Sequence, residues 1–167
     1  MKDGRREGGI YTAVQLWCRD PAAAKAQYGP IASWDTSEIT DMMRLFYYKA
    51  SFNGDISRWD VSSVTDMYSM LRGATSFNVD LSQWDVSNVT NMGYMFDGAT
   101  SFNGDLSQLD VSNVKTMYNM FKGATSFTHQ LGGAWSTSTA TKYAMLRNCP
   151  GSIAGKTKDA DGTPTPR

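Results

Sequence analysis

The chain has 167 residues, in which 16 lysines and arginines are balanced by 16 aspartates and glutamates. This length predicts one domain, alone or with short tails. Zero net charge argues against binding to nucleic acid or an anionic membrane through bulk electrostatics. Two cysteines are too few for a disulfide scaffold, and a single histidine excludes a Cys/His zinc cluster at ordinary spacing. No apolar run is long enough to span a bilayer, so no transmembrane segment is expected.

Residues 1–29 are expected to form an N-terminal segment with a helical cap. The first nine residues lack the apolar stretch of a secretory signal peptide. Apolar residues then follow at helical spacing, at Ile10, Val14, Trp17 and Cys18. Pro21 suits the first turn of a second short helix. These two helices would cover the first unit of a repeat.

Residues 30–149 are dominated by that internal repeat. Units of nearly the same sequence begin every 25 residues, at Trp34, Trp59, Trp84 and Leu109. A degraded unit follows from Trp135 and is expected to close the C-terminal end. A single unit cannot bury its own apolar face, so a strict period of this length predicts stacked units.

Within a unit the spacing of the apolar residues changes. Trp59 and Val61 lie two residues apart, which places both side chains on one face of a strand. The next apolar residues are three or four apart, which is typical of a helix; they are Val64, Met67, Met70, Leu71 and Ala74. The sequence therefore predicts an α/β fold, a short leucine-rich-repeat-like solenoid with one parallel strand and one short helix per repeat. Equivalent apolar residues would stack in columns as a hydrophobic core.

Residues 150–167 form a polar tail rich in Pro, Gly, Thr and charge. This composition predicts disorder. Cys18 and Cys149 would lie at opposite ends of the stack, farther apart than a disulfide allows.

The repeats carry a specific sequence pattern. The units WDVSSVTDMYSMLRGATSFN and WDVSNVTNMGYMFDGATSFN resemble the BspA-like leucine-rich-repeat surface protein family, and the resemblance covers about residues 30–148. It implies a leucine-rich-repeat fold and a protein-binding or adhesive role rather than an enzymatic activity. It also implies an extracellular or cell-surface location, with an organelle-associated location as the alternative. Leu109 and Lys115 stand where the family pattern has Trp and Thr.

Aspartates at fixed repeat positions are the first candidate binding residues. One column is expected to point outward from a concave sheet, beside Arg58, Gln83 and Gln108; it consists of Asp35, Asp60, Asp85 and Asp110. Its carboxylates would either accept hydrogen bonds from nearby backbone and hydroxyl groups, or bind a cationic partner or a hard metal ion. A second column, Asp55, Asp80 and Asp105, is expected to form Asx turns, with calcium binding as the alternative. Neither column has the dense spacing of a calcium loop, so no metal ligand is assigned.

Tyrosines on the outer face of the predicted helices are the second candidate. They are Tyr47, Tyr48, Tyr68, Tyr94 and Tyr118, and tyrosine is enriched at interfaces. Thr40, Thr65 and Thr90 form a partial hydroxyl column, for which helix capping is favoured over ice binding. Asn88 begins a glycosylation sequon. His129 has no partnered nucleophile, so no catalytic residue is assigned.

The sequence as a whole predicts a non-enzymatic protein–protein interaction module without a cofactor. It would bind another protein through the concave sheet or the exposed helix face. One alternative is an accessory or linker subunit of a larger assembly, including an algal membrane-associated one. The other alternative is a calcium- or carbohydrate-binding surface adhesin.

Overall fold

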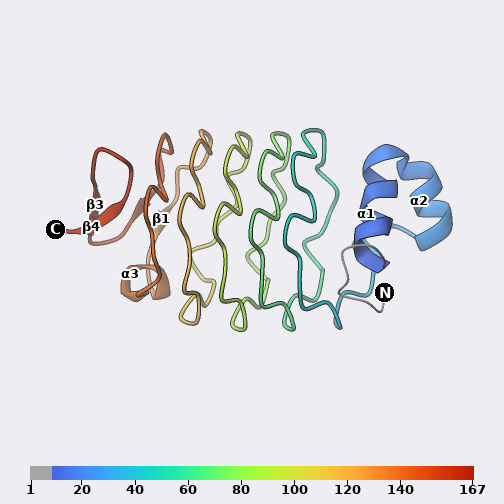
Figure 1. Ribbon diagram of the computed structural model, residues 1–167, viewed down its shortest axis with the longest axis horizontal. Helices are drawn as coiled ribbons and strands as arrows, with labels where there is room; N and C mark the ends of the chain where they lie inside the picture. Colours follow the sequence, from blue (N-terminus) through green and yellow to red (C-terminus); the bar gives the residue numbers. More distant parts are fainter. Residues whose placement is uncertain (1–8) are drawn as a thin grey trace.

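The computed structural model describes residues 9–167. Helices and strands lie only at its two ends, as Figure 1 shows. The N-terminal end holds α1 (Gly9–Arg19), α2 (Pro21–Tyr28) and a 3₁₀ helix, Ile31–Ser33. The C-terminal end holds β1 (Gln130–Leu131), α3 (Ala134–Thr137), β2 (Ser152–Ile153), β3 (Lys156–Lys158) and β4 (Pro164–Pro166). Strands β1 and β2 pair in parallel, and β3 and β4 pair antiparallel.

The prediction of an α/β leucine-rich-repeat-like solenoid, with a strand and a helix in every repeat, is wrong. From Trp34 to His129 the described backbone forms turns and isolated bridges but no helix and no strand. Equivalent residues interrupt each expected helix with a positive φ of 50–59°, at Arg44, Ser69, Tyr94, Asn119 and Ala144. A right-handed helix cannot continue through a residue in the left-handed region. Trp59 and Val61 lie between two turns rather than in a strand.

Backbone hydrogen bonds between neighbouring repeats take the place of regular elements. The amides of Ser69 and Leu71 donate to the carbonyls of Gly93 and Met95 at 2.9 and 3.0 Å. The amide between them, Met70, closes a tight turn onto Met67. Because some amides bond inside a repeat and others bond across to the next one, these polar backbone groups are satisfied without a sheet.

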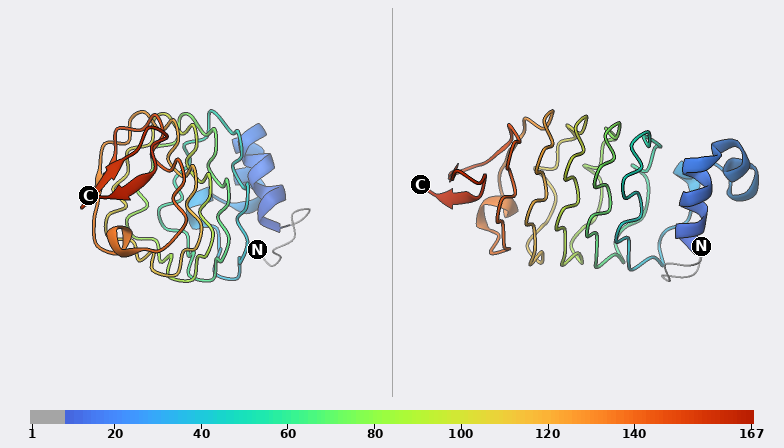
Figure 2. Two further views of the ribbon diagram at one scale, coloured as in Figure 1. Left: turned by 60° about the vertical axis from the view of Figure 1, so that its left-hand side comes forward. Right: turned by 45° about the horizontal axis from the view of Figure 1, so that its top comes forward.

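The repeats therefore lie side by side as irregular coils, which we call repeat coils (Figures 1 and 2). Single parallel bridges join equivalent residues of consecutive coils, at Asp41, Asp66, Asn91, Thr116 and Thr141. The left-hand view of Figure 2 shows the coils enclosing a common interior. The 25-residue period therefore brings equivalent residues of consecutive coils side by side, where their backbones form hydrogen bonds.

The apolar columns predicted from the repeat are buried in this interior. The phenylalanine column stacks nearly parallel, with ring centroids 5.8–6.0 Å apart between Phe52, Phe77, Phe102 and Phe127. In the tryptophan column each indole N–H donates to a backbone carbonyl, for example from Trp59 to Ile31 at 2.8 Å and from Trp84 to Ile56 at 3.1 Å. A buried indole needs such a partner, which explains why the tryptophans recur in register.

Leu109 interrupts the tryptophan column and leaves a small apolar cavity of about 10 Å³ beside Trp84, Leu106 and Met120. We expect Leu109→Trp to stabilise the protein by about 1 kcal/mol, because the indole removes more apolar surface from water and gains a backbone acceptor. Urea unfolding at equilibrium measures the change, with Leu109→Met as the control of similar volume. A net destabilisation would show that the cavity does not accept the larger ring.

The helical periodicity of residues 10–28 is confirmed by α1 and α2, whereas residues 1–8 of the expected N-terminal segment lie outside the described residues. Asp20 caps α2 by accepting from the Ala23 amide at 3.0 Å, and Pro21 occupies its first turn. Trp17 packs edge-on against Trp34, with ring centroids 5.7 Å apart. Helix α1 therefore covers the first repeat coil.

The prediction that residues 150–167 are disordered is wrong. The Ala144 amide donates to Thr163 Oγ1, and the Leu146 amide donates to the Gly162 carbonyl, both at 2.9 Å. In the preceding coils the equivalent amides donate to the next coil, so the tail supplies the acceptors that a further coil would have supplied. Amino-acid composition did not predict this order, because the tail is held by hydrogen bonds rather than by apolar side chains. Cys18 and Cys149 are free thiols in α1 and beside the tail.

Candidate functional site

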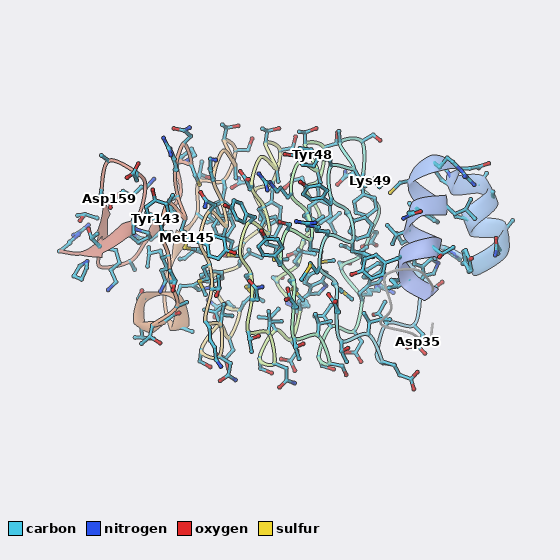
Figure 3. The ribbon with its side chains drawn as sticks, viewed as in Figure 1. Asp35, Tyr48, Lys49, Tyr143, Met145 and Asp159 are labelled. Carbon is cyan, nitrogen blue, oxygen red and sulfur yellow. The ribbon has the colours of Figure 1, made fainter. Side chains whose placement is uncertain are left out.

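The first aspartate column lies on turns, because the concave sheet that was expected to carry it is absent. Asp60 Oδ1 accepts from the Ser62 amide at 3.0 Å and from the Ser62 hydroxyl at 2.6 Å. Asp35, Asp85 and Asp110 accept in the same way from the amide two residues later. Asp35 lies at the lower edge of the coils in Figure 3, away from Tyr48. Each carboxylate therefore closes an Asx turn.

These hydrogen bonds lower the pKa values of Asp60, Asp85 and Asp110. The Ser62 hydroxyl and amide hold the pKa of Asp60 below its ordinary range. The like charges of Asp35 and Asp85 act in the other direction and raise it, but by less. Because the pKa in the folded state is the lower one, the bonds stabilise the fold above the pKa of the unfolded chain. That stabilisation is lost as the pH falls through the folded-state value.

We expect Ser62→Ala to raise the pKa of Asp60 toward its ordinary value, because the largest cause of the depression is removed. Carboxyl carbon chemical shifts followed by NMR from neutral to acidic pH measure the change. Ser63→Ala is the control, since no hydrogen bond joins Ser63 to this carboxylate. An unchanged Asp60 titration in Ser62→Ala would contradict this assignment of the depression.

The other predicted polar residues are also used locally. Asp55 accepts from the Ser57 hydroxyl at 2.6 Å, and Asp80 and Asp105 accept from the amides of Ser82 and Ser107. Gln83 and Gln108 donate to the serine beside each of them, and Arg58 is exposed. Within residues 9–167 no group of three or more His, Cys, Asp or Glu is placed to hold a metal ion. The columns thus stabilise turns.

The hydroxyl column, the sequon and the histidine take part in bonds between coils. The hydroxyls of Thr65 and Thr90 donate to the carbonyls of Thr40 and Thr65 at 3.2 and 3.1 Å. Their predicted role as helix caps is wrong, because no helix follows them. Asn88 Nδ2 donates to the Ser62 carbonyl at 2.8 Å, and His129 Nε2 lies 2.9 Å from the Asn103 carbonyl.

The predicted tyrosines come together although the helix face expected to carry them is absent. Tyr94 contacts Tyr118 and Tyr68 with ring centroids 5.1 and 5.7 Å apart, both edge to face. Tyr47 and Tyr48 contact each other at 4.5 Å in the same geometry. Tyrosines from four consecutive repeat coils thus form two groups of rings in contact, Tyr47 with Tyr48 and Tyr68 with Tyr94 and Tyr118.

Two arginines that the sequence analysis did not single out connect the tyrosines. The Arg44 guanidinium lies 5.3 Å from the Tyr47 ring and 5.8 Å from the Tyr68 ring. Arg72 lies 4.7 Å from the Tyr94 ring and forms an ion pair with Asp97 at 2.8 Å. The repeat could have indicated Arg72, because it occupies the same repeat position as Tyr47, 25 residues earlier. We call this set the tyrosine–arginine surface: Arg44, Tyr47, Tyr48, Tyr68, Arg72, Tyr94 and Tyr118.

Glycines in neighbouring coils make room for the rings. A Cβ atom on Gly73 would lie 2.5 Å from Cδ1 of Tyr48, and one on Gly93 would lie 3.1 Å from Cζ of Tyr118. Tyr48 nevertheless remains 59% exposed. Tyr143, one repeat beyond Tyr118, is 55% exposed. The rings are therefore held in place by their neighbours while part of the surface stays open to solvent.

Comparisons with known proteins add a family. The model of a family described as "Mycoplasma protein of unknown function, DUF285" matches residues 20–135 and, in a second overlapping match, residues 77–150. No curated protein and no solved structure matches the chain. Among residues 9–167 there is no helix of the length and apolar character needed to cross a membrane.

Proposed function

Since the chain belongs to the family of Mycoplasma proteins of unknown function, DUF285, we propose its role from its surface: a non-enzymatic protein–protein interaction module of the BspA-like surface-protein type. Its partner binds the tyrosine–arginine surface. The family description names no activity, so the proposal depends on the chemistry of this surface.

The observation that carries the proposal is the contiguous set of tyrosines and arginines on neighbouring coils. Tyrosine and arginine are enriched among the residues that dominate binding energy at interfaces. Edge-to-face rings and stacked guanidinium groups are already ordered before binding, so less side-chain entropy is lost when a partner docks. Tyr48, at 59% exposure, gives a partner direct access to this set.

The aspartate columns support a binding role less well. Their carboxylates already accept hydrogen bonds from serines of their own turns. A partner cation would compete with those bonds. The first-choice face of the sequence analysis is therefore replaced by the tyrosine–arginine surface.

The repeat itself offers a gentle way to test the surface. Arg44→Ser and Tyr48→Gly install the residues that the next coil has at the equivalent positions, Ser69 and Gly73. Both of those residues have a positive φ, like Arg44 and Tyr48. The double variant is therefore expected to fold. Arg58→Ser removes an exposed arginine from the aspartate side as the matched control.

Random peptides displayed on phage are selected on the wild-type protein, and the affinities of the selected peptides are then measured against both variants. We expect the affinities to fall at least tenfold for the double variant and to be unchanged for Arg58→Ser. Circular dichroism and thermal unfolding confirm that the variants fold. Equal binding to wild type and double variant would overturn the proposed surface.

A further inference from the structure

A hollow of about 420 Å³ lies between the two N-terminal helices and the first repeat coil. Helix α1 contributes Gln15 and Arg19 to its lining, α2 contributes Gln27 and Tyr28, and the first coil contributes Lys49. Gln27 Nε2 donates to Tyr28 Oη at 2.9 Å, which orients these two side chains. The lining has two cations and no carboxylate.

The two cations that line this hollow are not held in ion pairs within the described part of the chain. Neither Arg19 nor Lys49 forms an ion pair with a residue between 9 and 167. Arg44, an exposed residue, also forms no ion pair with a residue between 9 and 167, and its guanidinium lies near the rings of Tyr47 and Tyr68. Arg72 differs, because Asp97 neutralises it.

Three carboxylates beside the tyrosine–arginine surface have hydrogen-bond or ion-pair partners within the protein. Asp41 accepts from the Met43 amide at 2.7 Å, and Asp66 accepts from the Tyr68 amide at 2.7 Å and from Asn91 Nδ2 at 3.2 Å. Asp97 is held by Arg72. Hydrogen bonds from neutral amides leave the negative charges of Asp41 and Asp66 in place. The cations open to an acidic partner are therefore those of the hollow, where Arg19 and Lys49 line a wall without a carboxylate.

The hollow and the tyrosine–arginine surface adjoin each other. Tyr48 belongs to the surface and Lys49, the next residue, lines the hollow. Figure 3 shows Lys49 on the side of the first coil that lies toward α1, and Tyr48 farther from α1, toward the next coil. One extended segment can therefore contact the rings and the cations together.

Resting on the proposed function, we infer that the partner presents an acidic peptide segment. Its carboxylates bind Arg19 and Lys49 in the hollow, and its apolar side chains lie against the tyrosine–arginine surface. Charge-assisted hydrogen bonds from arginine and lysine suit carboxylates. Charge complementarity of this kind selects among partners and speeds their association.

Synthetic fluorescein-labelled peptides test the inference by fluorescence anisotropy. In one peptide glutamates alternate with phenylalanines, in a second lysines replace the glutamates, and in a third prolines and tyrosines alternate. We expect the glutamate peptide to bind at least tenfold more tightly than the other two. Its affinity should fall as salt is raised, because the charges are partly exposed.

Matched variants locate the carboxylates. Arg19→Gln combined with Lys49→Gln should weaken binding of the glutamate peptide at least tenfold, whereas Lys25→Gln, on the exposed side of α2, should leave it unchanged. Equal binding of the lysine or proline peptide, or no loss in the double variant, would overturn the acidic partner. If the acidic partner were overturned in this way while peptide binding still required Arg44 and Tyr48, the proposed function would stand. Binding of free succinate as tight as that of the peptide would overturn a peptide ligand.

Discussion

Gly162→Ala is expected to release the C-terminal tail from the last repeat coil and to destabilise the protein by about 3 kcal/mol. Gly162 has a φ of 81°, which costs an alanine about 1–2 kcal/mol. An added Cβ atom would also lie 2.5 Å from the Cα atom of Arg147, so the two backbones must move apart. This separation breaks the bonds that Ala144 and Leu146 donate to the tail.

Gly155→Ala is the matched control for this prediction. Gly155 has a φ of 73° in the same tail, but no atom lies within 4 Å of its added Cβ atom. Its substitution should therefore cost only the backbone strain, about 1–2 kcal/mol. Urea unfolding gives both free energies, and amide hydrogen exchange at Ala144 and Leu146 reports release of the tail. Equal losses in the two variants, with both amides still protected, would contradict this account of the tail.

The repeat could be read from the sequence, but its local backbone could not. Apolar residues three apart, such as Val64 and Met67, satisfy a helix and a series of tight turns equally well, because both bring residues i and i+3 together. What decides between them is the left-handed backbone at Ser69, a residue type without a strong preference for that region. Glycine appears only at the second left-handed position, Gly73, where it reads as an ordinary helix end.

The candidate site was foreseeable in part for a similar reason. The outward tyrosines follow from the alternation of buried and exposed positions in each repeat. Arg44 and Arg72 join them only because three neighbouring coils bring these side chains together. The hollow beyond them could not be predicted at all, since Arg19 and Lys49 come from different elements and meet only when α1 docks on the first coil.

The tail shows the limit of composition as a guide. Its sequence is polar enough to predict disorder, yet Lys158 donates to the Cys149 carbonyl at 2.6 Å, and Gly162 and Thr163 accept two amides of the last coil. The backbone amides of the last coil, such as Ala144 and Leu146, lack acceptors from a following coil, and this need arises only once the coils have folded. It favours any segment that can supply acceptors at the right spacing.

Phe102→Ala is expected to destabilise the protein by about 3–5 kcal/mol, the usual range for deleting a fully buried ring. Phe102 is 0% exposed. Its ring centroid lies 4.1 Å from that of Phe96, and 6.0 Å from those of Phe77 and Phe127 in the adjacent coils. The loss is a large share of the total stability of a typical domain, which is about 5–15 kcal/mol.

The position of Phe102 makes a second effect measurable. In a stacked repeat each coil is stabilised mainly by its neighbours, so weakening one interior contact uncouples the parts on either side. Calorimetry should therefore show a broadened or split transition for Phe102→Ala and a single one for Phe102→Leu, which keeps most of the side-chain volume. Tyr143→Ala, at an exposed ring, should change stability by less than about 0.5 kcal/mol. A loss below 1 kcal/mol with one sharp transition in Phe102→Ala would mean that the backbone bonds between coils, rather than the ring column, couple the repeats.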